Sequence, residues 1–314
     1  MALLLLALSA GCADVPPVAK IGLIAPFEGL YRESGYGALE ALRQALADCT
    51  PPGMAVVPLA LDNAADPARA RRAAQKLLVD PAVQAVIGPL ELASTAAVAE
   101  VMAAPAGESR RPLPWIAPAL VEPAGGYPLH PSDASPGALA AAALASADAP
   151  PRRLLVVGLP DTLAGDLPAA VEGVPVYWLA DGPAALAAWQ EGDAVLWLGQ
   201  EAEAAAFLLA AGRPLPLWLG PQAGHAVLTA HLAAAGERSG AFLPSVRWLI
   251  WTDSGYTRWL QSSSTADPSR YLVYRAVCTA LMSLGRVQLP PSEPWQMQHI
   301  RLEVNGGREQ ITTR

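Results

Sequence analysis

Charged residues are scarce in this 314-residue sequence, and lysine is almost absent. Only 16% of the residues are charged, Lys20 and Lys76 are the only lysines, and the formal net charge is −7. Proteins that bind nucleic acid carry clusters of basic residues, and an acidic sequence without such clusters lacks that electrostatic footprint. We therefore expect no nucleic acid among the partners of this protein.

Motifs that carry catalysis or hold a cofactor are also missing. The sequence has no Gly-x-x-x-x-Gly-Lys phosphate loop, no Gly-x-Gly-x-x-Gly after its first strand, no His-Glu-x-x-His and no Gly-x-Ser-x-Gly turn. Among the four histidines, His225 and His231 are too far apart to share one helical face, as a metal-binding pair would. We expect no enzymatic activity, no cofactor and no metal site.

Long apolar runs are absent too, and the longest near the start is residues 3–8. A membrane-spanning helix needs roughly 20 apolar residues, so this run fits the apolar part of a signal peptide instead. Small residues immediately precede Cys12, as they do at a lipoprotein cleavage site. We predict a lipoprotein signal peptide over residues 1–12, with Cys12 as the lipidated residue. An ordinary signal peptide with a coincidental cysteine is the alternative.

This N-terminus predicts an exported protein. Lipid on Cys12 would anchor it in the bilayer, at the outer face of the cytoplasmic membrane or in the periplasm. The two other cysteines, Cys49 and Cys278, do not have the spacing of metal ligands. An oxidising compartment would permit a disulfide between them. Two separately buried thiols are the alternative, which the sequence alone slightly favours.

Short strand-like runs alternate with helix-like runs along most of the chain. The strand-like runs are rich in Val, Ile, Leu and Trp without strict alternation, which indicates strands buried on both faces of a parallel sheet. Strands are predicted at 19–25, 54–61, 83–88, 113–117, 153–158, 175–179, 193–198 and 215–219. Helices are predicted at 34–49, 66–79, 91–103, 136–146, 164–171, 183–190, 201–211, 224–235 and 268–285. This alternation predicts an α/β fold with doubly wound sheets.

The chain is too long for a single compact core. The pattern weakens in two proline-rich stretches, 120–135 and 286–296, which we interpret as crossovers between two Rossmann-like lobes. Lobe 1 is predicted at 18–130 and 248–298, and lobe 2 at 131–247 and 299–314. The last segment, 300–308, alternates in polarity and contains an Asn-Gly turn, which predicts a hairpin.

Several segments, taken in order, resemble a known family. They are AKIGLIAPFEG (19–29), LDNAADPARARRAAQKLLVD (61–80), VQAVIGPLELASTAAVAEVM (83–102), PWIAPA (114–119), LWLGPQ (217–222) and YLVYRAV (271–277). Their order and spacing resemble a type I periplasmic solute-binding protein of the branched-chain amino-acid, leucine-binding-like class of ABC transporters. The resemblance implies two lobes that close by a hinge on a small solute and then dock on an ABC permease in the membrane.

The expected binding loops depart from the family pattern. Amino-acid binders of this family place two hydroxyls and a carboxylate where this sequence has Leu92, Val121 and Gln222. An ammonium buried without a carboxylate costs several kcal/mol. The resemblance therefore implies a solute that is amino-acid-like or more apolar, preferably uncharged, with an apolar acid as the nearest competitor. The ligand-contacting residues expected in this alignment are Leu92, Ala119, Leu120, Val121 and Gln222.

A shift of one or two residues in this alignment would bring other side chains into the site. They are Glu91, Ser94, Thr95 and Glu122. Ser94, Thr95 and Glu91 equally suit the first turn of a helix, so helix capping is the alternative to ligand contact. Tyr31 and Tyr36 flank the first loop, where they could line the cleft.

Two functions remain open from the sequence. The first is a lipid-anchored solute-binding protein that supplies an ABC importer. The second is a non-transport sensor or envelope interaction module whose cleft has degenerated.

Overall fold

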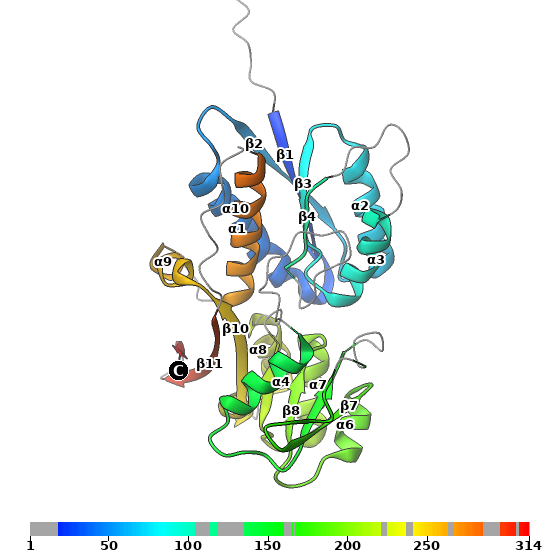
Figure 1. Ribbon diagram of the computed structural model, residues 1–314, viewed down its shortest axis with the longest axis vertical. Coiled ribbons are helices and arrows are strands. Elements are labelled where there is room, and N and C mark those ends of the chain that lie inside the picture. Colours follow the sequence, from blue (N-terminus) through cyan, green and yellow to red (C-terminus); the bar gives the residue numbers. More distant parts are fainter. Residues whose placement is uncertain are drawn as a thin grey trace, which may run out of the picture.

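The fold is described from a computed structural model, in which the described residues are 18–103, 113–118, 135–159, 165, 167–220, 225–236, 241–262, 267–284, 296–305 and 308–313. Two lobes, each a sheet covered by helices, follow one another along the long axis of the molecule (Figure 1). The predicted signal peptide and Cys12 lie outside the described residues. No helix among those described is long and apolar enough to cross a membrane.

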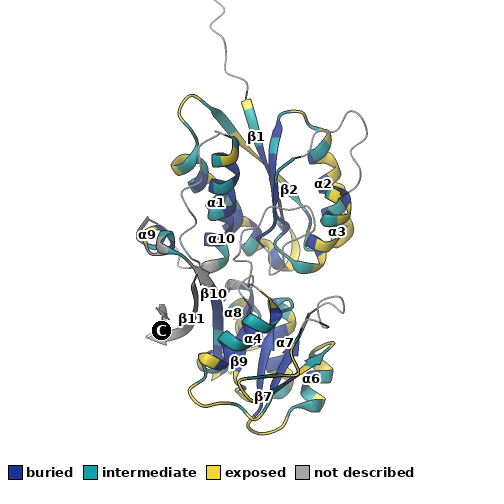
Figure 2. Cartoon of the chain, viewed as in Figure 1, coloured by how far each residue is buried: buried dark blue, intermediate teal, exposed yellow. Residues whose placement is uncertain are grey.

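Lobe 1 is built on a parallel sheet with the strand order β2-β1-β3-β4. Its strands are β1 (Val18–Ala25), β2 (Ala55–Asp62), β3 (Val83–Ile87) and β4 (Trp115–Ile116). The central strands β1 and β3 are buried over most of their length, which confirms the prediction from their continuous apolar runs. Figure 2 shows this buried sheet between helices whose outer faces are exposed.

Helices cover both faces of this sheet. One face carries α1 (Arg32–Cys49), which follows the 3₁₀ turn η1 (Gly29–Tyr31), and α10 (Pro268–Leu284). The other face carries α2 (Pro67–Val79) and α3 (Leu92–Ala103). The start of α2 follows from its sequence: Asp66 accepts a hydrogen bond from the backbone N–H of Arg69, and Pro67 occupies the first helical position.

A disulfide between Cys49 and Cys278 joins the end of α1 to α10. The sequence had slightly favoured two separate thiols, and that interpretation is wrong. The two cysteines are 229 positions apart, and only the packing of α10 against α1 brings them together. Local sequence patterns carry no information about that packing.

Lobe 2 is built on a mixed sheet with the order β12-β11-β10-β9-β8-β5-β7-β6. Five strands run parallel: β5 (Leu154–Val157), β7 (Val174–Leu179), β8 (Ala194–Trp197), β9 (Leu217–Leu219) and β10 (Val246–Thr252). Antiparallel strands flank them: β6 (Ala170–Val171) on one edge, and β11 (Gln296–Asn305) with β12 (Arg308–Thr313) on the other. The pairing of β11 with β12 confirms the C-terminal hairpin, whose turn residues lie outside the described part.

The helices of lobe 2 again lie on both faces of the sheet. On one face lies α4 (Pro136–Ala145); on the other lie α6 (Gly182–Ala188), α7 (Glu201–Ala211) and α8 (His225–Ala234). A 3₁₀ turn, η3 (Leu243–Ser245), precedes β10, and α9 (Ser254–Ser262) follows it. The predicted α/β fold with two doubly wound lobes is confirmed.

Three elements differ from the sequence expectation, one of them the helix α9, which was not expected. A helix was expected at 164–171, but Ala170 and Val171 form β6, which turns back antiparallel to β7 through Gly173 at φ 82°. Pro168 lies in the middle of the expected helix and lacks the N–H that a helix interior requires. The strand β10 was not expected, although Val246–Thr252 is rich in β-branched and aromatic residues.

The lobe boundaries expected at 247/248 and 298/299 fall inside β10 and β11, and both strands lie wholly in the sheet of lobe 2. A strand cannot be divided between lobes, because its backbone hydrogen bonds to one neighbour run along its length. The residue bounds of the two lobes stay a prediction, with these two boundaries moved to the ends of the strands. The chain thus passes between the lobes after β4, after β10 and after α10.

Candidate functional site

A cavity of about 290 Å³ lies between the two lobes. Its walls are formed where strands of both sheets end: after β3 and β4 in lobe 1, and after β5, β7 and β8 in lobe 2. Lobe 1 contributes Tyr31, Ser34, Leu90–Ala93, Pro118 and, from the start of α10, Ser269; lobe 2 contributes Gly158, Leu159, Ala180, Leu198–Glu201 and Glu203. Open α/β sheets bind ligands at the carboxyl ends of their strands, so this is where a ligand is expected.

The loop after β3 brings Glu91 to the cavity wall at the start of α3. It turns at Gly88, whose φ of 89° favours glycine and where any side chain would clash with the carbonyl oxygen of Ile24. The buried indole of Trp115 donates a 2.7 Å hydrogen bond to the carbonyl oxygen of Gly88. The loop is therefore fixed by its close approach to Ile24 and by its hydrogen bond from Trp115, and this sets the direction in which α3 begins.

The Glu91 carboxylate is positioned by a hydrogen bond from Asn63. The Asn63 side chain is completely buried, and its Nδ2 donates to Glu91 Oε2 at 2.9 Å and to Ser94 Oγ at 3.3 Å. The other oxygen, Glu91 Oε1, is closed off from solvent and has no hydrogen-bond partner among the described residues. Burial raises the pKa of Glu91 above its ordinary value of 4.5, because the charged form is poorly solvated there.

Asp62 organises the neighbouring loops. Its Oδ1 accepts from the backbone N–H groups of Phe27 at 2.7 Å, Glu28 at 3.2 Å and Ala64 at 3.0 Å. Ala64 and Ala65 then adopt φ of 46° and 58°, a region that costs energy for residues other than glycine. The turn sends Asn63 inward, where it meets Glu91.

The structure separates the lobe 1 candidates into two groups. Glu91 and Leu92 line the cavity. Ser94 and Thr95 are buried and do not line it: Ser94 Oγ bonds to Asn63, and Thr95 Oγ1 donates to the Glu91 carbonyl oxygen at 2.8 Å. Their hydroxyls therefore stabilise the first turn of α3. Ala119, Leu120, Val121, Glu122 and Gln222 lie outside the described residues.

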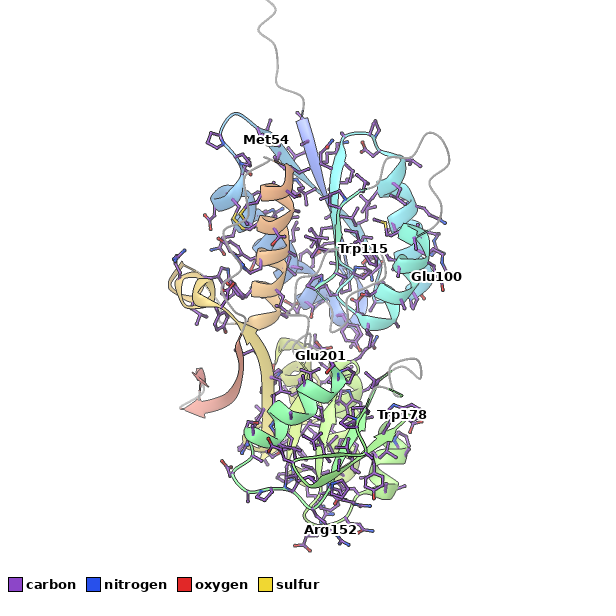
Figure 3. All side chains as sticks on the ribbon, in the orientation of Figure 1. Met54, Glu100, Trp115, Arg152, Trp178 and Glu201 are labelled. Atoms are coloured by element: carbon purple, nitrogen blue, oxygen red, sulfur yellow. A yellow bond between two sulfur atoms is a disulfide. The ribbon has the colours of Figure 1, made fainter. Side chains whose placement is uncertain are left out.

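The wall from lobe 2 carries acidic residues that the sequence interpretation missed. Gln200 is the N-terminal cap residue of α7, and Glu201 and Glu203 lie in its first turn. Figure 3 shows Glu201 at the end of lobe 2 that faces lobe 1. Glu201 is buried and Glu203 is exposed. The partial positive charge of the helix N-terminus favours carboxylates at these positions.

A signal for these residues was present in the sequence. Leu198-Gly199-Gln200-Glu201 follows a strand and opens a helix, as a ligand loop does in this kind of fold. The resemblance to the family instead implied a site in the loop at Gln222, one strand later. Tyr36, expected beside the cleft, is half exposed and contacts Phe27 edge to face, with ring centroids 5.8 Å apart.

Tyr31 crosses the cavity from lobe 1 to lobe 2. Its hydroxyl donates a 2.7 Å hydrogen bond to Gln200 Oε1. Burial raises the pKa of Tyr31 above its ordinary value, and the charges of Glu201, Glu203 and Glu91 raise it further. Tyr31 therefore keeps its proton and stays a hydrogen-bond donor.

The described wall of the cavity is acidic. Three carboxylates line it, and no Lys, Arg or His does so among the residues that the structure describes. No cluster of three or more His, Cys, Asp or Glu side chains in the described ranges could hold a metal ion. The wall suits a small organic solute with hydrogen-bond donors.

Comparisons with known proteins agree with this architecture. Residues 18–187, more than half of the chain, match the family model described as periplasmic binding protein. No curated protein matches the sequence.

Solved structures share the fold at low sequence identity. One is a leucine binding protein, LivK, from Thermotoga maritima, with 15% identity and a TM-score of 0.67 over 94% of this chain and 97% of that one. Another is the branched-chain amino acid transporter substrate binding protein LivJ from Streptococcus pneumoniae in complex with isoleucine, with 14% identity and a TM-score of 0.61 over 95% and 100%. A third is a fatty acid ABC transporter substrate-binding protein from Thermomonospora curvata, with 14% identity and a TM-score of 0.61 over 95% and 92%. The predicted resemblance is thus confirmed: this chain belongs to the periplasmic binding protein family.

Proposed function

We propose that this chain is the extracytoplasmic solute-binding protein of an ABC importer, which captures a small solute between its lobes and presents it to a membrane permease. The observation that carries the proposal is the cavity formed by strand ends of both lobes. A solute bound there contacts both walls at once, so its binding energy favours the closed arrangement of the lobes. Closure gives a permease a shape that it can distinguish from the empty protein.

Export and anchoring are part of the same proposal. The protein would be exported and held at the membrane by lipid on Cys12. The Cys49–Cys278 disulfide supports export, because disulfides persist mainly in oxidising compartments. A receptor held near the membrane meets its permease without diffusing away.

The test combines thermal unfolding with small-angle X-ray scattering on the mature chain. The solutes are leucine, isoleucine, a medium-chain fatty acid and butane-1,4-diamine. A solute at a hundredfold excess over its Kd stabilises the folded state by about 2.7 kcal/mol. We expect at least one solute to raise the unfolding temperature and to reduce the radius of gyration.

Two variants give a matched control. Leu92→Trp places a large side chain in the cavity and should abolish the response, whereas Val79→Trp makes a similar change at a position that is 77% exposed and should not. A protein that responds to no solute in either measurement would contradict the proposal and favour the sensor or interaction module with a degenerate cleft.

A further inference from the structure

We propose that the cleft selects a cationic solute, an organic molecule with an ammonium or guanidinium group, and that the Glu91 carboxylate of lobe 1 binds this group opposite Glu201 of lobe 2. This inference rests on the proposed function, whose binding site it specifies. It replaces the uncharged solute expected from Leu92, Val121 and Gln222, of which only Leu92 lies among the described residues.

The first argument for a cationic solute is the negative charge of the cavity walls. Glu91 comes from lobe 1, while Glu201 and Glu203 come from lobe 2, and the described lining contains no Lys, Arg or His. Closing the lobes around the cavity removes water from carboxylates, which is costly unless a positive group replaces it. An anionic solute would add repulsion, and an apolar one would leave Glu91 Oε1 without a donor.

The second argument for a cationic solute is the incomplete hydrogen bonding of the Glu91 carboxylate. Asn63 occupies Oε2 and fixes the plane of the carboxylate, while Oε1 is closed off from solvent and has no hydrogen-bond partner in the described part of the chain. Buried polar atoms are almost always hydrogen-bonded, and the exceptions often mark a place where a missing group belongs. A ligand N–H beside Glu91 would supply that donor, and a charged donor makes the stronger bond.

Helix capping alone does not account for this arrangement. A carboxylate in a first helical turn is stabilised by the helix N-terminus, and Glu201 and Glu203 fit that role. Glu91 also lies at the start of a helix, but burial raises its pKa, so its charged form is disfavoured in the empty site. Tyr31 adds a neutral donor among the three carboxylates and does not balance their charge.

The volume of the cavity and the side chains available around it narrow the class of cation. A cavity of about 290 Å³ is at the small end of ligand pockets. The absence of a candidate metal cluster from the described ranges favours an organic cation over a divalent metal ion. A short-chain amine or guanidine of a few carbons fits both conditions.

The experiment is calorimetry on the mature full chain at low salt, with four probes of similar length. They are butane-1,4-diamine (dication), leucine (zwitterion), butanamide (neutral) and butyrate (anion). We expect the diamine to bind most tightly and its affinity to fall as salt is added. Glu91→Gln keeps the size of the side chain and should weaken diamine binding roughly ten- to hundredfold. Glu28→Gln, at an exposed carboxylate outside the cavity, should leave it unchanged.

The outcomes separate this inference from the proposed function. Leucine, butanamide or butyrate binding as tightly as the diamine would overturn the cation selectivity while leaving a solute-binding protein. Diamine binding that Glu91→Gln does not weaken would overturn the role of Glu91. A wild-type protein that binds none of the probes and does not close would count against both. The wild-type ranking needs no variant, so the inference stays testable if Glu91→Gln fails to fold.

Discussion

The hydroxyl of Tyr31 donates a 2.7 Å hydrogen bond to Oε1 of Gln200, and this bond joins the two lobes across their cavity. Tyr31 ends the turn η1, just after the loop that follows β1, and Gln200 is the residue immediately before α7. Both residues also line the cavity. The hydrogen bond that joins the two lobes is therefore made by residues of the candidate binding site.

The first prediction is that Tyr31→Phe loosens the contact between the lobes. The variant keeps the ring and removes one hydrogen bond, worth about 1 kcal/mol. Without ligand, we expect a larger mean distance between spin labels placed on α2 and α6, measured by pulsed electron paramagnetic resonance. Tyr36→Phe removes a hydroxyl from a half-exposed tyrosine on α1 and should change nothing. Equal distances in both variants would show that the bond does not hold the lobes.

The second prediction concerns the disulfide between α1 and α10. Cys49→Ser combined with Cys278→Ser should lower the free energy of unfolding by about 2–5 kcal/mol, since the bond constrains a long loop in the unfolded chain. Urea unfolding with and without reductant measures this. Reductant should destabilise the wild type and leave the double variant unchanged. A wild type that does not respond to reductant and has free thiols by mass spectrometry would contradict the bond.

The third prediction tests the buried ion pair of lobe 2. The Asp193 carboxylate is closed off from solvent, where it accepts from Arg153 Nε at 3.0 Å and from the backbone N–H of Gln190 at 2.8 Å. Asp193→Ala should cost about 1–3 kcal/mol in urea unfolding, because Arg153 and the backbone N–H of Gln190 lose their acceptor. Glu33→Ala breaks the exposed pair of Arg32 and Glu33 and should have little effect. Comparable losses in both variants would contradict this difference.

Local signals were sufficient to predict much of the scaffold. Asp66, Ser135 and Asp181 each accept a hydrogen bond from a backbone N–H three residues on, and a proline stands in the first turn after each. Apolar runs such as Leu154–Val157 are buried along their whole length, as parallel strands between two layers of helices must be. Both kinds of signal act over a few residues, so they can be recognised without knowing the tertiary fold.

The site was harder to predict because it depends on distant contacts. Glu91 was named among the candidates, but its role as a buried carboxylate depends on Asn63, 28 positions earlier. Glu201 belongs to the site because β8 ends opposite lobe 1, which no pattern within its own segment reveals. The pairing of Cys49 with Cys278 depends on distant packing in the same way.

The fourth prediction is that Cys12 anchors the protein. Acyl chains on this residue would contribute about 0.8 kcal/mol per buried CH₂, so two chains hold the protein firmly in a bilayer. Cys12→Ala should move the protein from the membrane fraction to the soluble fraction, measured by immunoblotting of fractionated cells. Ala13→Ser leaves the cysteine in place and should fractionate as the wild type does. Unchanged fractionation of Cys12→Ala would rule out lipid at this residue.

The last prediction follows from the titration of Glu91. Burial raises its pKa in the folded protein above 4.5, so over a range of pH the folded state keeps a proton that the unfolded chain releases. The stability that this group contributes is fully present below its unfolded pKa and is lost as the pH rises through the folded pKa. Glu91→Gln cannot ionise. Its unfolding temperature relative to the wild type should therefore rise as the pH increases from about 4 to 7.

The groups that face Glu91 are the same in both proteins. They are Asn63, which bonds to it, the neighbouring Ser94, the charge of Asp62, and Tyr31, Glu201 and Glu203 across the cavity. Their contributions should largely cancel in the difference, which leaves Glu91. A bound cation favours the ionised carboxylate, so diamine affinity should rise over the same pH range in the wild type but not in Glu91→Gln. Calorimetry in buffers of different ionisation enthalpy would detect the proton released. Binding that is equally pH-dependent in both proteins would assign the titration to another carboxylate.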